Sequence, residues 1–231
     1  MSDRLGGAVG RRPLHFIWLL DVSGSMAVGG KIQALNTAIE ETLPQLREDA
    51  RDHPQAEILM RAMTFATTTS WLQRRPVPVE QFRWDPVGAV PQGLTELGAA
   101  ILALVDPMRE LAEVGRGFAP VIVLVSDGKP THTAGPTTAD AIPVLLAEPW
   151  GRASVRMAVG IGEDADMEAL STFIAHPDRT PLRAANPSDL VAMIQWVSRQ
   201  GSRVASLATG RDGASVGMPV SSGPVWDAST T

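Results

Sequence analysis

Five side chains that carry oxygen stand where they could hold one hard metal ion. They are Asp21, Ser23, Ser25, Thr95 and Asp127. The first three alternate along one short stretch, the fourth opens a helical pattern, and the fifth begins an Asp-Gly pair. Mg²⁺ prefers oxygen ligands in an octahedral array. The set therefore predicts a magnesium site, with Mn²⁺ as an alternative ion.

Two apolar runs must position these residues. Residues 15–20 and 121–125 have the composition of strands that are buried on both faces, as in the middle of a parallel sheet. Asp21 and Asp127 come just after these runs. In an open α/β sheet, ligands bind at the carboxyl edge, at the point where the strand order reverses. We therefore expect the two strands to be neighbours, with both carboxylates at one edge.

The remaining sequence alternates between helical and strand patterns. Helices are expected at about 31–48 with a kink at Pro44, at 97–105, near 142–146, at 167–174 and from Asn186-Pro187 onward. Further strands are expected at 57–65, 67–72, 155–161 and 182–184, and the polar 67–72 run suits an antiparallel edge strand. These elements predict an α/β fold: a doubly wound, mainly parallel sheet with one antiparallel edge strand and helices on both faces.

The five residues together resemble the metal-ion-dependent adhesion site of the von Willebrand factor A (vWA) domain family. That site combines D-x-S-x-S with a distant Thr and a distant Asp-Gly, and the resemblance covers residues 14–200. It implies that Ser23, Ser25 and Thr95 bind the ion directly, and that Asp21 and Asp127 act directly or through water. It also implies that a partner protein supplies an Asp or Glu to the open position. The sequence has no G-x-x-x-x-G-K-S/T or H-E-x-x-H motif, so we expect that the chain is not an enzyme.

Two strings narrow the resemblance within the family. L-L-D-V-S-G-S-M at 19–26 and S-D-G-K-P-T at 126–131 are similar to bacterial intracellular members of the tellurite-resistance-associated, TerY-like group. This similarity implies a role in a stress-response or signalling complex, alongside a kinase and a phosphatase as partners.

Other interpretations of the same residues stay open. Asp21 and Asp127 could cap turns, with the serines satisfying backbone groups. The acids could also serve a Mg²⁺-dependent hydrolase or phosphoryl-transfer enzyme, although such catalysis needs a positioned nucleophile and a base, and no third group is evident. A regulatory partner of an AAA+ ATPase is a further binding role.

The position of the site residues also carries an expectation about stability. Side chains at a sheet edge are expected to be exposed, so truncation of Thr95 or Asp127 should change stability by no more than about 0.5 kcal/mol. Loss of Asp127 is expected to relieve repulsion with Asp21.

The composition of the chain indicates which classes of partner to expect and which cellular compartment. The 231 residues carry a net charge of -5, which gives no basic footprint for nucleic acid. The chain has 0 Cys, which excludes disulfides and suits a reducing cytoplasm. No run approaches the ~18 apolar residues of a membrane span, so no membrane partner is expected. We expect a flexible lead-in at 1–13, a vWA domain at 14–200 and a Ser/Gly-rich disordered tail at 201–231.

Overall fold

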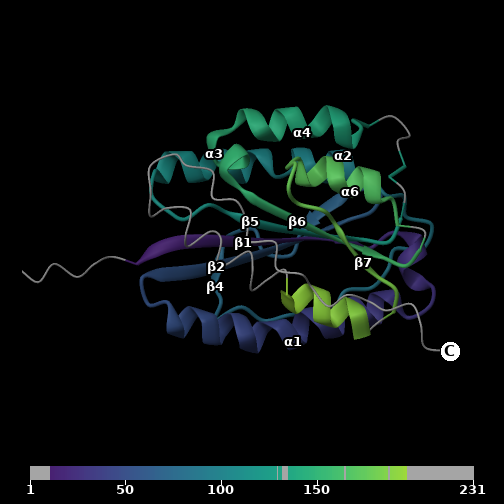
Figure 1. Cartoon of the computed structure of the whole chain (residues 1–231), viewed down its shortest axis with the longest axis horizontal. Helices are drawn as coiled ribbons and strands as arrows, with labels where there is room; N and C mark the ends of the chain where they lie inside the picture. Colours follow the sequence, from purple (N-terminus) through teal and green to yellow (C-terminus); the bar gives the residue numbers. More distant parts are fainter. Residues whose placement is uncertain (1–10, 129, 132–134, 164, 187, 197–231) are drawn as a thin grey trace, which may run out of the picture.

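A seven-stranded sheet runs through the middle of the protein (Figure 1). This computed structural model describes residues 11–128, 130–131, 135–163, 165–186 and 188–196. The strands are β1 (Arg12–Asp21), β2 (Ala56–Phe65), β3 (Thr69–Trp71), β4 (Val77–Pro78), β5 (Val121–Ser126), β6 (Val155–Ile161) and β7 (Leu182–Ala184). Their order in the sheet is β3-β2-β1-β5-β6-β7, with β4 paired to β2.

The strand order reverses between β1 and β5. β1 lies parallel to β2 on one side and parallel to β5 on the other, with Phe16 opposite Val121 and Leu20 opposite Val125. The chain therefore winds from β1 in one direction to β2 and in the other direction to β5, β6 and β7, as in a doubly wound sheet. The expected pairing of the two apolar strands is confirmed, and both strands end at the same edge.

Side chains of β1 alternate between two hydrophobic cores, because successive residues of a strand point to opposite faces. Phe16, Trp18 and Leu20 pack with α1 (Lys31–Asp52) and with a helix at 188–196, whereas Ile17 and Leu19 pack on the other face. That second face is covered by α2 (Leu97–Leu102), α3 (Val105–Val114), α4 (Thr138–Ala147) and α6 (Met167–Ile174). Figure 1 shows α1 below the sheet and these four helices above it. The predicted fold class is confirmed.

At the edge of the sheet next to β2, the short strands β3 and β4 both run antiparallel to β2. Phe65 lies opposite Thr69, so β3 is the antiparallel edge strand that the 67–72 pattern predicts. β4 also pairs with β2 in the antiparallel sense, with Leu59 opposite Pro78. This second pairing was not expected, because a two-residue strand has no periodicity to detect. Pro78 is accommodated because prolines in sheets are confined to edges.

Two helices differ from the expected boundaries. α1 continues through Pro44 to Asp52, past the expected end near residue 48, and its buried Leu46 and Ala50 keep this last part against the sheet. The single helix expected at 97–105 is divided into α2 and α3, which separate at Ala103 and Leu104. Pro107 lies in the first turn of α3, where proline is best tolerated because its missing N–H would have no helical partner there.

The last described helix occupies 188–196, after a short α5 (Pro149–Ala153), β6, α6 and β7. Asn186 caps it as expected, since its side-chain oxygen accepts the N–H of Asp189 at 2.9 Å. Leu190 and Ile194 are fully buried. Residues 1–10 of the expected lead-in and the whole of the expected tail at 201–231 lie outside the described residues.

Candidate metal site

Asp21, the last residue of β1, joins the ends of the two central strands. Its Oδ1 accepts the N–H of Ser23 at 2.8 Å, and its Oδ2 accepts the hydroxyl of Ser126 at 2.6 Å. Ser126 is the last residue of β5. The carboxylate therefore fixes the start of the D-x-S-x-S loop and ties it to β5 at the switch point.

Asp127 accepts hydrogen bonds from two donors, one in the D-x-S-x-S loop and one at the start of α1. Its Oδ1 accepts the hydroxyl of Ser25 at 2.7 Å, and its Oδ2 accepts the ammonium of Lys31 at 2.6 Å. The Oγ of Ser25 in turn lies 3.1 Å from the Oγ of Ser23. A continuous chain of hydrogen bonds thus links both serines of the loop to the second aspartate.

Thr95 lies on the long segment that crosses from β4 to α2, and two neighbouring loops hold it. The hydroxyl of Thr131 accepts the N–H of Thr95 at 2.6 Å, and the carbonyl of Thr95 accepts the N–H of Thr131 at 2.9 Å. Gly24 donates its N–H to the carbonyl of Gly93 at 3.1 Å. A Cβ at Gly24 would lie 3.2 Å from the nitrogen of Gln92, so a glycine lets the two loops approach this closely.

Thr95 and the loop serines face a common space. A Cβ placed on Gly128 would lie 3.4 Å from Oγ1 of Thr95 and 3.6 Å from Oγ of Ser25. With the hydrogen bonds above, this brings all five residues of the predicted set together at one edge of the sheet. Their role as metal ligands stays a prediction.

The expected exposure of these residues is wrong. Relative exposure is 0% for Asp21, 1% for Asp127 and 5% for Thr95, while Ser25 is exposed and marks the open side. The segment before Thr95 covers the site, because it is hydrogen-bonded across the D-x-S-x-S loop. Burial raises the pKa of Asp21, the hydrogen bonds from Ser126 and Ser23 act against that rise, and the charge of Asp127 adds to it.

Three further residues complete the arrangement without having been in the predicted set: Ser126, Thr131 and Lys31. Ser126 could have been found as the last strand residue beside Asp127. Lys31 carries a weaker signal, since a cation at the start of a helix is unfavourable for the helix dipole and therefore calls for another partner. That partner is Asp127, so loss of Asp127 would remove an ion pair with Lys31 as well as the repulsion that raises the pKa of Asp21.

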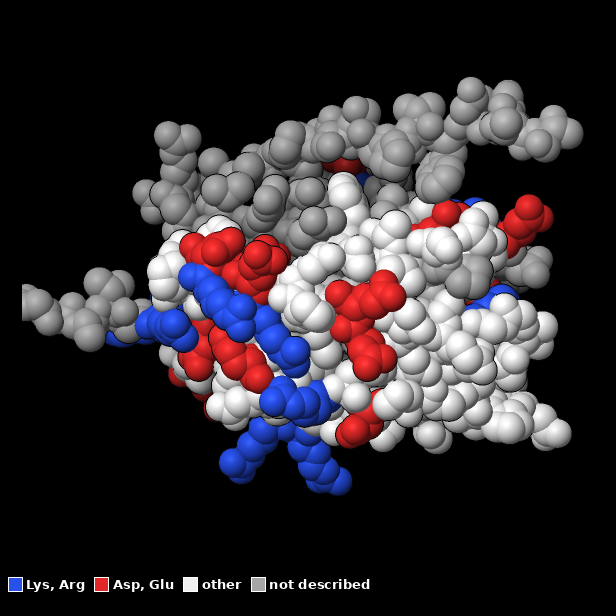
Figure 2. Space-filling model, turned by 90° about the horizontal axis from the view of Figure 1, so that it is seen from below, with Lys and Arg blue, Asp and Glu red and all other residues white. Residues whose placement is uncertain are grey.

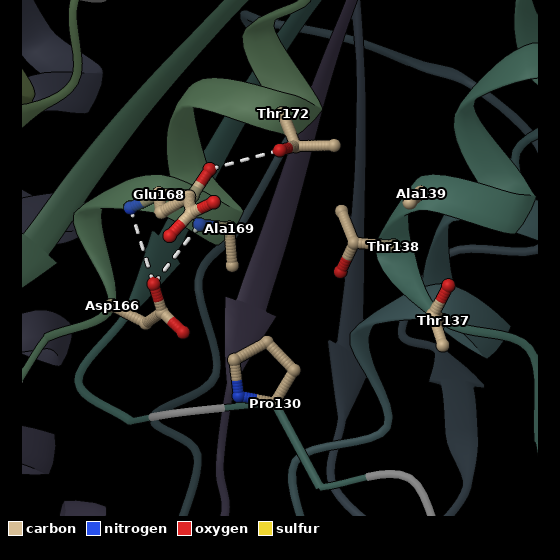
Figure 3. Close-up of a pocket in the computed structure, with 8 residues that line it drawn as sticks. All are labelled: Pro130, Thr137, Thr138, Ala139, Asp166, Glu168, Ala169 and Thr172. Carbon is tan, nitrogen blue, oxygen red and sulfur yellow. Dashed lines mark hydrogen bonds between the residues drawn. The ribbon is translucent and has the colours of Figure 1, made fainter.

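An open groove of about 220 Å³ lies beside this site, between the N-terminal ends of α4 and α6. Figure 3 shows Asp166, Glu168 and Thr172 on one side facing Thr138 on the other, with Pro130 between them at the base. Oδ1 of Asp166 is engaged by the N–H groups of the first turn of α6, at 3.0 and 3.1 Å. The groove therefore presents hydroxyl, methyl and carboxylate groups to an approaching molecule.

Charged side chains on the α1 face have both signs. Seen from below, Lys and Arg side chains lie among Asp and Glu side chains, and much of the visible described surface is uncharged (Figure 2). The described part of this face therefore lacks a broad basic area. No helix within the described ranges is both long enough and apolar enough to cross a membrane.

The donor set fits a hard divalent cation. All five predicted ligands offer oxygen, which Mg²⁺ and Mn²⁺ prefer over the nitrogen and sulfur that suit softer ions. Only two of the five are carboxylates, and the described residues include no group of three or more His, Cys, Asp or Glu that could hold a metal ion. Binding at this position would thus depend on the three hydroxyl oxygens of Ser23, Ser25 and Thr95.

Several solved structures share this fold, although the comparisons of sequence found no match. No protein-family model matches the chain, and no curated protein sequence matches it. Proximal thread matrix protein 1 from the mussel byssus, in a structure with a zinc-occupied MIDAS motif, has 15% identity and a TM-score of 0.58, over 81% of this chain and 47% of that chain.

Two further neighbours are prokaryotic. The ArnB paralog VWA2 from Sulfolobus acidocaldarius has 17% identity and a TM-score of 0.56, over 79% of this chain and 44% of that chain. A von Willebrand factor type A protein from Catenulispora acidiphila has 15% identity and a TM-score of 0.59, over 82% of this chain and 43% of that chain. The chain spans less than half the length of each of these three proteins. At these identities the likeness shows the fold, which is the Rossmann-like fold of vWA domains.

Proposed function

We propose that this protein is a metal-dependent adapter of the vWA family, which captures a carboxylate of a partner protein at the Asp21–Asp127 edge. The observation that carries the proposal is the convergence of Ser23, Ser25 and Thr95 between the two aspartates. Ser23, Ser25 and Thr95 would hold Mg²⁺ directly, with Asp21 and Asp127 beside them. When bound, the ion supplies a Lewis-acidic position for an anionic oxygen from outside.

The hydrogen bonds of the two aspartates support a recognition role. Both oxygens of Asp21 and both oxygens of Asp127 already accept a donor. The carboxylates would therefore orient the hydroxyl groups that bind the ion. Hydroxyl ligands carry no formal charge, so they leave the positive charge of the ion largely uncompensated. A site of this kind keeps a demand for one more anionic ligand, which a partner Asp or Glu would meet.

Binding is a better account than catalysis for the described residues. A hydrolase needs a positioned nucleophile or water and a base close to the metal. His15 lies near the start of β1, His53 follows α1, and His176 follows α6, so these three histidines are not at the site. We therefore propose a non-enzymatic role, with a Mg²⁺-dependent hydrolase or phosphoryl-transfer enzyme as the competing function.

The groove between α4 and α6 extends the surface available to a partner. It begins at Pro130, beside Thr131, which holds the backbone of Thr95. A partner whose acidic side chain reaches the metal would place its neighbouring residues in or near this groove. The two strings similar to the TerY-like group support a cytoplasmic, bacterial stress-response or signalling complex as its setting, with a kinase or phosphatase among its partners.

The experiment that tests the adapter role is affinity capture with the full chain, in Mg²⁺ and in EDTA. Partners found by mass spectrometry in Mg²⁺ should be lost in EDTA and lost with Asp21→Ala, and a partner variant with its critical Glu or Asp changed to Gln or Asn should also fail. Capture that persists in EDTA would place recognition elsewhere. Mg²⁺-dependent turnover of a phosphoester or acyl substrate, abolished by Asp21→Asn, would favour the enzyme.

A further inference from the structure

Lys31 places a positive charge inside the candidate metal site. Its Nζ lies 2.6 Å from Oδ2 of Asp127, and the side chains are 23% and 0% exposed respectively. Lysine side chains are mostly exposed in proteins and are rarely buried without a partner. The partial burial of this side chain is therefore explained by its contact with Asp127.

The position of Lys31 is poor for helix stability. It is the first residue of α1, where the positive end of the helix dipole disfavours a cation. Gly29 and Gly30 precede it at φ values of 67° and 76°, a left-handed turn that glycine adopts readily. A Cβ on Gly162, just after β6, would lie 3.9 Å from Cε of Lys31, so the lysine stem runs along the carboxyl edge of the sheet.

The formal charges of the contacting groups can be counted. Asp21 and Asp127 contribute two negative charges and Lys31 returns one positive charge, which leaves one negative charge in the hydrogen-bonded site. Glu96 follows Thr95, but a Cβ on Gly135 would lie 3.0 Å from its Oε2, so this carboxylate points towards Gly135. A divalent ion would leave the site with one positive charge, whereas without Lys31 the loaded site would be neutral.

We propose that Lys31 is a specificity-determining residue of this site. By neutralising Asp127 it keeps the metal-loaded site cationic, so that the site selects an anionic carboxylate over a neutral oxygen ligand. The same charge opposes the metal ion and weakens its binding when no carboxylate is present. This inference rests on the proposed function. It specifies that the ligand is negatively charged and that Lys31 is the residue that selects for this charge.

The test measures two affinities of the purified full chain. Mn²⁺ binding is followed by EPR titration, alone and with saturating acetate or with acetamide, the uncharged analogue of acetate. In the wild type, acetate should tighten Mn²⁺ binding and acetamide should not. In Lys31→Met, which keeps the aliphatic stem, Mn²⁺ alone should bind about tenfold more tightly, because a unit charge close by is removed. The additional effect of acetate should fall towards that of acetamide.

Lys31→Arg is the matched control, because it keeps the positive charge and should retain the acetate preference of the wild type. Circular dichroism of each variant checks that it is folded before titration. A Lys31→Met variant that binds Mn²⁺ no more tightly, or that keeps the full acetate preference, would overturn the role of Lys31. If the wild type binds no Mn²⁺, the proposed metal site itself fails, and the two failures are thus distinguished.

Discussion

The hydroxyl of Ser126 donates a 2.6 Å hydrogen bond to Oδ2 of Asp21, and so connects the last residue of β5 to the last residue of β1. Both side chains are almost completely buried, at 2% and 0% exposure. The carboxylate at the switch point is therefore part of the packed structure as well as of the candidate site. Changes at this edge should have consequences for stability as well as for metal binding.

Ser126→Ala should destabilise the metal-free protein by about 1–3 kcal/mol, because it leaves a buried carboxylate oxygen without a donor. Urea unfolding in EDTA measures this change. Ser171→Ala is the control, since Ser171 is exposed on α6, and its effect should stay within about 0.5 kcal/mol. Equal unfolding midpoints for the two variants would show that the bond to Asp21 contributes nothing.

Asp21→Asn should stabilise the metal-free protein more at pH 7 than at low pH. Burial raises the pKa of Asp21 above its unfolded value, so the ionised carboxylate destabilises the fold at pH values above that raised pKa. The penalty is removed as the pH falls through the raised pKa, and the difference between Asn and Asp should therefore shrink. Urea unfolding of both proteins in EDTA over this pH range measures it. A difference that grows on acidification would contradict the raised pKa.

The sequence was sufficient to predict the central part of this arrangement. Residues 16–20 and 121–125 are apolar at every position because both faces of these strands are buried, and the oxygen residues after them stand out for that reason. The division of the 97–105 helix was not predicted, because its apolar spacing continues through the break. Neither was the burial of Thr95, because it depends on hydrogen bonds that its segment makes with Gly24 and Thr131 from separate loops. Such long-range contacts leave no local periodicity.

Thr95→Val should lower the affinity for Mn²⁺, because it replaces a predicted ligand oxygen by a methyl group of similar shape. Thr131→Val should have a smaller effect, since it removes only the acceptor of the Thr95 N–H. Both are measured by EPR titration, with Thr180→Val as a control on the exposed segment before β7. Unchanged Mn²⁺ affinity in Thr95→Val would remove Thr95 from the ligand set.

Gly98→Ala should destabilise the fold by about 1–3 kcal/mol. A Cβ at Gly98 would lie 1.9 Å from the backbone oxygen of Pro136, so α2 and the segment before α4 would have to separate. Gly88→Ala is the matched control, because nothing lies within 4 Å of a Cβ there, and it should be neutral or slightly stabilising. The two variants are compared by urea unfolding, and equal stability would show that the close approach can relax without cost.

Arg156 is a buried arginine of β6 that connects this strand to α5 and α6 through hydrogen bonds. Its guanidinium donates to the carbonyls of Phe173 and Ile174, both at 3.1 Å, and so satisfies the C-terminal end of α6. It also donates to the carbonyl of Gly151 at 2.8 Å and to the hydroxyl of Ser154 at 2.8 Å. Burial, together with the charge of Arg179, lowers the pKa of Arg156 to about 10, which still leaves it protonated at neutral pH.

Arg156→Met should therefore cost about 2–4 kcal/mol, because several buried carbonyls lose their donor at once. Arg156→Lys should recover only part of this loss, since one ammonium cannot reproduce the planar fork that reaches α5 and α6 together. Arg152→Met, at an exposed position of α5, is the control for removing an arginine and should change stability by no more than about 0.5 kcal/mol. Urea unfolding ranks the four proteins. If Arg156→Met unfolds at the same urea concentration as Arg152→Met, the carbonyls of α6 must be satisfied without the guanidinium, and the anchoring role of Arg156 is wrong.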